Sequence, residues 1–553
     1  CNSCRSFDWA VVNNSQGVDD LANWPVETLY SLQQERAHMM THIAETGIHP
    51  SGFLRGSEEH TAWKHSQRDR YEEAIAAERR FIRTRAALLA SKTIREFEEA
   101  WFSWSSDYRG RVYPQQTLLS PQGPSVEKVL LRFSQGEHLS PEGETEVLAA
   151  IGVAFKGNRL SLADRAAWGK ANLKELLDAT AGGDPADVKM LSSQFGAKDP
   201  WDALQLLRAA ERTFRRGQPW DVPLGIDASQ SGTQLLGGLL RDYSTLVATN
   251  VLVGHLGPDK GPEDGYLHVQ NAARFILDAK PDALLSVTSA GFVERLEKLD
   301  PVVRCWVARL MNHANARKAM KLTSMPMVYG STHQGTAHGL DAWIRAQGID
   351  LVAELGSWQA QQAVVNGLTT VLREAVRLTF PKAMTALGWL KRLAQLSLKQ
   401  QLEAGVALPE LRWTLSDGTV IAYHESELET KRIHTLQMGT VKVPVGAGLE
   451  TDVAKTVAAF APGFIHSLDG LLLRVALQGW SKPVITIHDS IKVLPGDIPA
   501  LKGRIREGFI EVCSRNPLEG LAAQMGVSME QLPLLEMGKA DLEKVRLSRY
   551  MFH

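Results

Sequence analysis

Two aspartates stand at the ends of short apolar segments with strand-like composition. Asp227 follows PLGI, and Asp489 follows VITIH. One aspartate at such a position is usually a cap or turn residue, but two of them can share a divalent metal site. Mg²⁺ takes a few carboxylate oxygens and leaves its other positions to water and substrate phosphates. Phosphoryl-transfer enzymes hold two such ions about 3.5–4 Å apart to activate the nucleophile and stabilise the leaving oxygen.

Between the aspartates, residues 315–330 (NARKAMKLTSMPMVYG) carry cations at helical spacing. Arg317 and Lys321 are four residues apart and therefore share one helix face, and Tyr329 lies about two turns further along the same side. A solvated helix face is the ordinary explanation of this spacing. Cations and an aromatic ring on one face also suit a surface that grips a triphosphate while the ring contacts a sugar or base. Neither the acids nor this helix decides the chemistry alone.

The elements that position these residues are predominantly helical. Residues 61–97 and 359–398 have helical composition, the second with a break at Pro381. Segments around the acids read as a strand at 220–227, a helix at 231–241, and a strand, acidic turn and return strand at 483–492. Residues 411–437 begin with an alternating pattern around Asp417-Gly418, which indicates a hairpin. Residues 439–448 contain three glycines and a proline, so we expect an irregular or hairpin loop there.

Composition indicates a globular chain of several subdomains. The 553 residues exceed what one hydrophobic core usually organises, so we expect two to four subdomains. Lys and Arg number 61 against 62 Asp and Glu, a net charge of −1, although arginines cluster locally at 79–85 and 212–216. Four cysteines fit a reducing compartment, and the lone Cys1–Cys4 CxxC pair is expected to be an ordinary N-terminal segment rather than a zinc site. No segment approaches the roughly 18 consecutive apolar residues of a membrane span.

Taken together and in this order, the motifs resemble the single-subunit DNA-dependent RNA polymerases of bacteriophage and mitochondrial type. The resemblance rests on residues 107–113 (DYRGRVY), 227–234 (DASQSGTQ), 240–242 (LRD), the 317–330 helix, 464–470 (FIHSLDG) with Arg474, 488–490 (HDS) and the aromatic C-terminal residues 550–553 (YMFH). It implies an α+β, predominantly helical right-hand fold. The implied subdomains are a thumb with a remnant of an N-terminal region (1–98), palm (99–250), fingers with the specificity-loop region (251–466), and palm with a C-terminal foot (467–553).

The resemblance also implies residue roles. Asp227 and Asp489 would hold two Mg²⁺, helped by the backbone carbonyl of Ala228. Lys321, with Arg317 beside it, would meet the triphosphate and could protonate pyrophosphate, while Tyr329 and His466 would sense the ribose 2′-OH. Template or hybrid contacts would come from a further set: Arg109, Arg111, Tyr113 and Arg474. The implied partners are template DNA, nascent RNA and ribonucleoside triphosphates, with no membrane, and the protein would act as a monomer. It would work in the cytoplasm of a bacterial host if phage-encoded, with the mitochondrial matrix as the alternative.

Three departures from the family pattern stand out. The bacteriophage enzymes commonly carry a second basic residue directly after the helix lysine, and this chain has Leu322 there. Another cation would therefore have to make that part of the triphosphate contact. Leu468 replaces a familiar polar residue before Asp469, and the 439–448 region looks short for a specificity loop. The family's N-terminal domain is absent from the sequence, so we expect either a compact member or a chain without that domain.

Two other functions compete with this interpretation. A family A DNA polymerase shares the palm acids and the Arg/Lys/aromatic helix, but those enzymes usually have Glu after the second Asp, where this chain has Ser490. A catalytically dead nucleic-acid-binding module would be expected to have lost Asp227, Asp489 or Lys321, and all three are present.

Overall fold

The structure, a computed structural model, describes residues 3–5, 32, 34–35, 38, 58–94, 97, 99–181, 186–254, 257, 261–435, 439–515 and 517–553. In this part of the chain, helices dominate and the strands form five small sheets of two or three strands. The predicted helix-rich α+β class is therefore confirmed. Cys1 lies outside the described residues, as does the side chain of Cys4.

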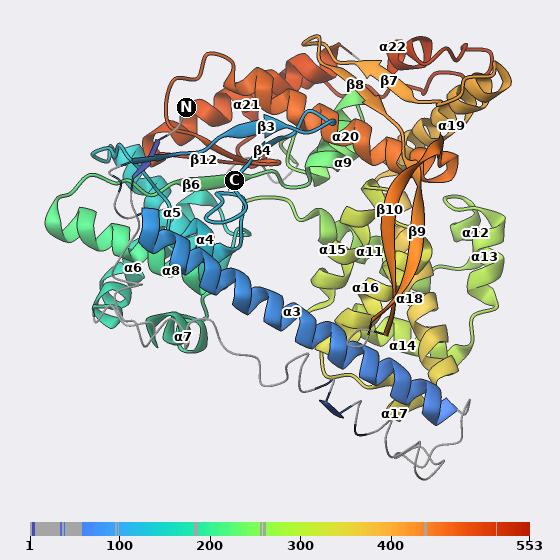
Figure 1. The fold of residues 1–553 in the computed structure, drawn as a ribbon, viewed down its shortest axis with the longest axis horizontal. Coiled ribbons are helices and arrows are strands. Elements are labelled where there is room, and N and C mark those ends of the chain that lie inside the picture. Colours follow the sequence, from blue (N-terminus) through green and yellow to red (C-terminus); the bar gives the residue numbers. More distant parts are fainter. Residues whose placement is uncertain are drawn as a thin grey trace.

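The longest element is α3 (Glu58–Ile94), which runs as a single rod along one side of the molecule (Figure 1). It corresponds to the helix predicted at 61–97. Its junction with the rest of the chain is at α4 (Ser125–Lys128), where Arg83 Nε donates to Oε1 of the buried Glu127 at 2.6 Å. This contact fixes where the rod attaches, because the fully buried Glu127 carboxylate needs a partner while the Arg83 side chain stays half exposed.

Two groups of helices flank the centre of the molecule (Figure 1). The first comprises α5 (Pro141–Lys156), α6 (Leu162–Ala179), α7 (Ala186–Ser193) and α8 (Pro200–Ala210), followed by the π-helix η2 (Glu211–Arg215). The Asp199 side chain accepts hydrogen bonds from the first turn of α8, and Pro200 occupies the first helical position, which explains why the helix begins there.

The second group contains the cation-bearing helix. Its members are α11 (Gly265–Asp278), α12 (Pro281–Leu285), α13 (Ala290–Glu297), α14 (Pro301–Met311), α15 (Ala316–Val328), α16 (His333–Ala346), α17 (Leu351–Leu355) and α18 (Trp358–Thr379). Helix α18 ends where Pro381 begins α19 (Pro381–Glu403), which confirms the predicted break. Helix α15 packs against α11, α16 and α18, so its orientation is fixed on three sides.

A three-stranded antiparallel sheet lies at the junction of these groups. Its strand order is β11 (Ile485–Ile487), β12 (Ser490–Val493), β6 (Leu224–Asp227). Helices α9 (Ser231–Leu239), α20 (Val453–Leu477) and α21 (Ile498–Ser514) pack against one another beside this sheet. Within the described residues α20 is long and apolar enough to cross a membrane, but 67% of its most apolar window is buried inside the protein, which identifies it as a core helix.

Two hairpins precede α20. Strands β7 (Leu411–Thr414) and β8 (Val420–Tyr423) pair across a turn in which Gly418 has φ +82°, as predicted. We expected an irregular or hairpin loop at 439–448. The residues do belong to a hairpin, but they form one of its strands, β10 (Gly439–Thr451), which pairs with β9 (Ser426–Thr435) as a long ribbon. A register shift between Pro444 and Gly446 accommodates the proline and glycine within the strand.

The remaining elements are short. They are β1 (Ser3–Arg5), β2 (Glu99–Trp101), β3 (Trp104–Ser106), β4 (Val112–Pro114), β5 (Arg132–Phe133), α10 (Tyr243–Ala248), η3 (Pro495–Asp497), α22 (Pro517–Gln524) and η4 (Leu542–Leu547). Strands β3 and β4 bracket the DYRGRVY motif and pair antiparallel, so this motif forms the loop of a hairpin.

Candidate active site

The central sheet brings the two predicted aspartates to the same edge. Asp227 is the last residue of β6 and pairs in register with Ser490, the residue after Asp489. The turn between β11 and β12 is only two residues long, and His488 adopts φ +56° in it, as two-residue hairpin turns require. The backbone N–H of Ala228 donates to the Asp489 carbonyl at 3.4 Å, so the two acids are neighbours.

The C-terminal residues pair with the strand that carries Asp227. The His553 N–H donates to the Asp227 carbonyl at 3.0 Å, and the Ser229 N–H donates to the Met551 carbonyl at 3.3 Å. Ala228 and Phe552 form an antiparallel bridge. The C-terminal segment therefore lies beside the acids, as the resemblance implied.

Asp489 lies close enough to Asp227 to affect the charge of Asp227. The Asp227 side chain is partly open to solvent, but protein crowds its other sides, and this loss of solvation raises its pKa to about 7. The negative charge of Asp489 raises the pKa further, while the Lys321 ammonium and the Ala228 N–H lower it. An additional cation between the acids would relieve this repulsion.

The donor set fits Mg²⁺ in a substrate-assisted site. No group of three or more His, Cys, Asp or Glu side chains forms a metal cage in the described part of the chain. Two hard carboxylates without such a cage match an ion that completes its shell with water and phosphate oxygens.

Helix α15 presents its cations at the edge of the site. Its apolar side packs inward, Lys321 is exposed, and the effect of Lys321 on the pKa of Asp227 shows that the two groups are close. Two contacts hold the Arg317 side chain: its Nε donates to Asp264 Oδ2 at 2.6 Å, and its guanidinium lies 4.9 Å from the centre of the Tyr266 ring. Lys321 and Arg317 thus lie on one helix face, as predicted.

Tyr329 caps the C-terminal end of α15 and reaches back to α9. Burial raises the pKa of its hydroxyl to about 12, and the nearby Gly232 N–H lowers it slightly. A Cβ on Gly232 would lie 3.2 Å from the Tyr329 hydroxyl and 2.8 Å from Val328, so glycine is needed for this close approach. The phenol is therefore held in one position.

His466 of α20 lies against Tyr329, with the two rings 4.9 Å apart. Its Nδ1 lies 3.2 Å from Arg109 Nη1, and an arginine can only donate, so Nδ1 accepts and Nε2 carries the proton. Burial and the charges of Arg111 and Arg109 lower the pKa of His466 to about 3, which keeps the ring neutral. The structure thus joins the two residues predicted to read the sugar.

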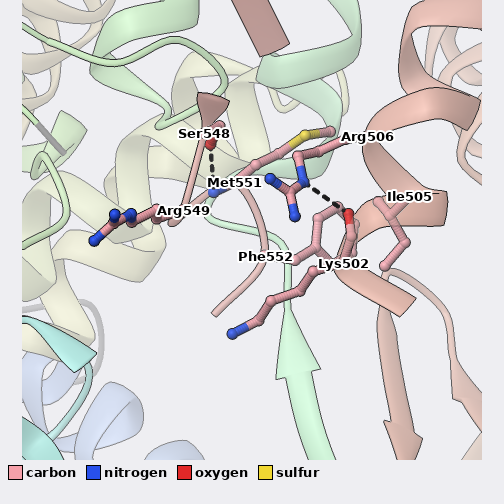
Figure 2. A pocket seen from close by; sticks show the side chains of 7 residues that line it. All are labelled: Lys502, Ile505, Arg506, Ser548, Arg549, Met551 and Phe552. Atoms are coloured by element: carbon pink, nitrogen blue, oxygen red, sulfur yellow. Dashed lines mark hydrogen bonds between the residues drawn. The ribbon is translucent and has the colours of Figure 1, made fainter. Parts of the chain in front are cut away.

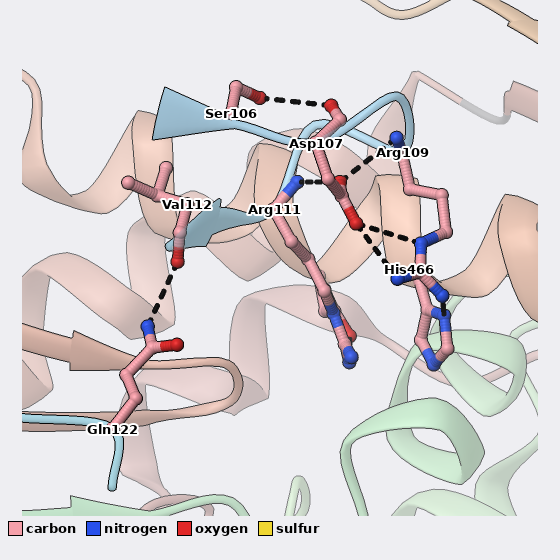
Figure 3. Close-up of polar contacts among 8 residues, drawn as sticks. Ser106, Asp107, Arg109, Arg111, Val112, Gln122 and His466 are labelled. Atoms are coloured by element: carbon pink, nitrogen blue, oxygen red, sulfur yellow. Dashed lines mark hydrogen bonds and ion pairs between the residues drawn. The ribbon is translucent and has the colours of Figure 1, made fainter. Parts of the chain in front are cut away.

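The DYRGRVY loop is organised by Asp107. Its Oδ1 accepts the backbone N–H groups of Arg109 and Arg111 at 2.9 and 3.0 Å, and its Oδ2 accepts Arg109 Nε at 2.9 Å. Figure 3 shows this carboxylate between the two arginines, with the Arg109 side chain reaching His466. Gly110 makes the turn with φ +81°.

Three of the four predicted template contacts, Arg109, Arg111 and Arg474, are engaged within the protein. Arg111 Nε donates to Oδ1 of the buried Asp469 at 2.9 Å, and Arg474 donates to the Gly110 carbonyl at 2.6 Å and to Asp417 at 2.7 Å. Arg109 retains a quarter of its side-chain surface, and the Tyr113 ring lies edge-on to His488 at 5.1 Å. These contacts tie the loop to α20.

Comparison with known proteins identifies the family. The sequence model described as DNA-dependent RNA polymerase matches residues 148–536, which include both aspartates, α15 and α20. This chain belongs to that family. The match starts after the DYRGRVY loop and ends before the C-terminal segment, so those two parts of the site rest on the geometry above.

Individual relatives come from plants and bacteriophages. The mitochondrial DNA-directed RNA polymerase 1B of Nicotiana tabacum is 26% identical over 482 residues, which cover 84% of this chain and 44% of that protein. T7 RNA polymerase of Escherichia phage T7 is 24% identical over 537 residues, 92% of this chain and 58% of that protein. The DNA-directed RNA polymerase of Enterobacteria phage T3 is 24% identical over 571 residues, 97% and 62% respectively. The chain thus spans about half the length of the curated relatives it matches.

Sequence reasoning gave no role to several residues that hold this family member's site together. Asp107 and Asp469 fix the arginines, and Asp264 holds Arg317. Lys198 was also missed, although Arg317 and Arg159 are close enough to lower its pKa, after burial as the main cause. Lys198 lies in a short connection between α7 and α8, where no periodic pattern could have indicated it.

Proposed function

We propose that the chain catalyses DNA-templated synthesis of RNA from ribonucleoside triphosphates, releasing pyrophosphate. One observation carries this proposal: antiparallel pairing puts Asp227 and Asp489 side by side, with the Lys321 ammonium close enough to lower the pKa of Asp227. A carboxylate pair beside a mobile cation suits transfer of a nucleotidyl group, in which a 3′-hydroxyl forms a bond to the α-phosphorus and the bond to pyrophosphate breaks. The DNA-directed RNA polymerases among the relatives support it.

Asp227 and Asp489 are the proposed ligands of two Mg²⁺, with the carbonyl of Ala228 as a further oxygen donor. When bound, these ions would stabilise the attacking and leaving oxygens as Lewis acids. The residues themselves have two tasks. The rigid two-residue turn keeps Asp489 next to Asp227, and the C-terminal segment holds the backbone of Asp227 through two hydrogen bonds.

A group of cations is proposed to grip the triphosphate. Lys321 and Arg317 come from α15, and Lys198 supplies the charge that Leu322 does not. The exposed Lys321 ammonium is also the proposed proton donor to pyrophosphate as it leaves. The support for Lys198 is its position: burial lowers its pKa, and the nearby charges of Arg159 and Arg317 lower it further, so a triphosphate held by Arg317 would lie within reach of a second cation.

Ribose selection is proposed for the Tyr329–His466 pair. The neutral His466 ring offers its Nε2–H as a hydrogen-bond donor, and Arg109 fixes that tautomer from the opposite nitrogen. A 2′-hydroxyl can accept such a bond, and a deoxyribose cannot.

Template and hybrid contacts are proposed for Arg109, Tyr113 and Arg474, since the Arg109 and Arg474 side chains keep 26% and 29% of their surface exposed despite their internal contacts. Arg111 and Arg474 are also proposed as positioning residues, because their guanidinium groups hold Asp469, Asp417 and the Gly110 carbonyl. They keep the DYRGRVY loop against α20, so that Arg109 meets His466.

The right-hand arrangement is proposed from the same layout. The α3 rod (within 1–98) would be the thumb, the central sheet with its flanking helices (99–250 and 467–553) the palm and foot, and α11–α18 with the β9–β10 ribbon (251–466) the fingers and specificity loop. The partners would be template DNA, nascent RNA and ribonucleotides, and the chain would act as a monomer. Relatives named for phages and for mitochondria fit either a bacterial host's cytoplasm or an organelle.

The DNA polymerase alternative is less well supported. Ser490 pairs directly with Asp227 and donates its hydroxyl to the Ile226 carbonyl at 3.1 Å, where a family A enzyme usually has a glutamate. The family model and the relatives named above are RNA polymerases.

The test is extension of an RNA primer on a preassembled RNA–DNA scaffold, with ribonucleotides or deoxyribonucleotides and with Mg²⁺ or EDTA. We expect Mg²⁺-dependent extension that strongly prefers ribonucleotides. A preference for deoxyribonucleotides would identify a DNA polymerase, and template binding without extension would identify a binding module.

A further inference from the structure

A cavity lies behind the C-terminal segment, and neither of the two aspartates nor any residue of α15 lines it. It has a volume of about 520 Å³ and is walled by α5, the start of α6, α21 and the C-terminal segment. Pockets of this size hold ligands of about mononucleotide size. Figure 2 shows an adjoining recess that shares Lys502, Arg506 and Arg549 with the cavity and contacts Met551 and Phe552.

The walls combine an excess of positive charge with apolar surface. Four cationic residues (Arg165, Lys502, Arg506, Arg549) face two acids (Glu142, Glu146), and the other lining residues are mostly apolar or aromatic. Lys502 pairs with Glu146 at 3.5 Å. Burial nevertheless lowers the pKa of Lys502, and the charges of Arg165 and Arg506 lower it further. Arg165 and Arg506 also donate to backbone carbonyls, but the cationic side chains in the wall still outnumber the acidic ones, which favours an anion there.

The distribution of polar groups favours one ligand class. Tyr550, Pro499 and Leu162 offer surface for a flat ring, while Lys502 and Arg506 offer donors to a phosphate on the α21 side. The α5 wall presents Glu142 and the Thr145 hydroxyl, which suit sugar hydroxyls. Ring surface, partners for hydroxyl groups and cationic donors in one cavity together suit a nucleoside monophosphate.

The cavity also touches the residues that hold the metal-binding strand. Tyr550 and His553 line it, and His553 exchanges backbone hydrogen bonds with Asp227, one at 3.0 Å and one at 3.5 Å. The Tyr550 hydroxyl accepts a bond from the Leu162 N–H at 3.3 Å, which links the segment to α6. A ligand that contacts Tyr550 and His553 would therefore stabilise the conformation in which the C-terminal segment pairs with the Asp227 strand.

We propose that this cavity is a second nucleotide site, which binds a nucleoside monophosphate and clamps the C-terminal segment against the strand of Asp227. Binding energy stabilises the conformation that forms the site. Nothing in the clamp requires a triphosphate or a divalent metal, which separates it from the proposed active site.

The test uses adenosine 5′-monophosphate as the probe and the whole chain in EDTA. Calorimetry should detect binding of the monophosphate, with weaker binding of adenosine and of inorganic phosphate alone. Lys502→Gln removes a donor charge and should weaken binding roughly tenfold or more. Ala163→Trp, at the exposed mouth beside Leu162, should block it without changing charge. Lys170→Gln, an exposed lysine on the same helix and outside the cavity, should bind like the wild type.

Hydrogen exchange gives a readout that does not need activity. Saturating monophosphate should slow exchange in residues 224–229 and 549–553 of the wild type but not of Ala163→Trp. Equal binding by the wild type and both cavity variants would overturn the site, and binding without slower exchange would overturn the clamp. Neither measurement depends on RNA synthesis, so the nucleotide site can be disproved without disproving the proposed function, and the reverse.

Discussion

At the scale of single residues, the negative charge of Asp227 is needed for the proposed activity but lowers the stability of the fold. Asp227→Asn or Asp489→Asn keeps the shape but removes one of two proposed metal ligands, so scaffold extension should fall by several orders of magnitude. The folded-state pKa of Asp227, about 7, lies above its ordinary 3.8. Ionisation therefore favours the unfolded chain, and its cost to stability grows from about pH 4 to about pH 7. In EDTA at pH 8, Asp227→Asn should melt at or above the wild-type temperature.

Asp278→Asn serves as the control, because Asp278 is an exposed acid at the end of α11. Near-normal extension by either active-site variant would contradict the metal assignment. A lower melting temperature for Asp227→Asn would show that the charge is compensated in the folded state.

The sugar-reading pair gives a second prediction at this scale. Tyr329→Phe removes the hydroxyl beside Gly232 and leaves the ring against His466. A site that reads a substrate hydroxyl through hydrogen bonds loses discrimination when a bond is removed. Deoxynucleotide incorporation should rise relative to ribonucleotide incorporation while overall extension is retained. The competition is measured on one template with both nucleotides, and an unchanged ratio in both Tyr329→Phe and His466→Ala would show that the sugar is read elsewhere.

At the scale of elements, the Arg111–Asp469 ion pair fastens the β3–β4 loop to α20. Asp469 is 2% exposed, and burial raises its pKa to about 6 although Arg111 pulls it down. Asp469→Asn leaves the Arg111 charge without its partner, which should cost about 3–5 kcal/mol of unfolding free energy. Urea unfolding of Asp469→Asn, Arg111→Gln and the double variant forms a thermodynamic cycle. The double variant should lose less stability than the two single variants combined, and simple additivity would contradict the coupling.

The elements also show what sequence patterns could and could not predict. The strand–turn–strand around Asp489, the helix break at Pro381 and the β7–β8 hairpin followed from local composition and were found as predicted. The β10 strand was missed because its Gly and Pro residues read as a loop. In a two-stranded ribbon both strands are edges, so a proline and a register shift cost little. Asp469 carried no local signal, since its partner is 358 residues away.

At the scale of the whole molecule, the chain carries all the proposed chemical residues but has almost no net charge. The proposed chemical residues lie between Asp107 and Asp489, and the net charge is −1. One of the basic clusters noted in the sequence is neutralised internally, because Arg212, Arg215 and Arg216 pair with Asp221, Asp178 and Glu211. Few net cations are therefore left to offset the phosphates of a duplex.

The last prediction follows from this charge balance and from the relatives, of which the chain matches 44–62%. Used alone, the 553-residue chain should extend RNA on a single-stranded or pre-melted template but start poorly on a closed duplex promoter, because opening a duplex needs binding energy that this surface does not supply. Runoff transcription from the closed duplex is compared with extension of an assembled hybrid at one fixed salt concentration. A second comparison at higher salt should weaken duplex binding steeply and spare extension of the assembled hybrid, where base pairing already holds the primer. Equal efficiency on both templates would show that the 553 residues suffice to open DNA, and the α3 rod and the β9–β10 ribbon would then be the first elements to test for that task.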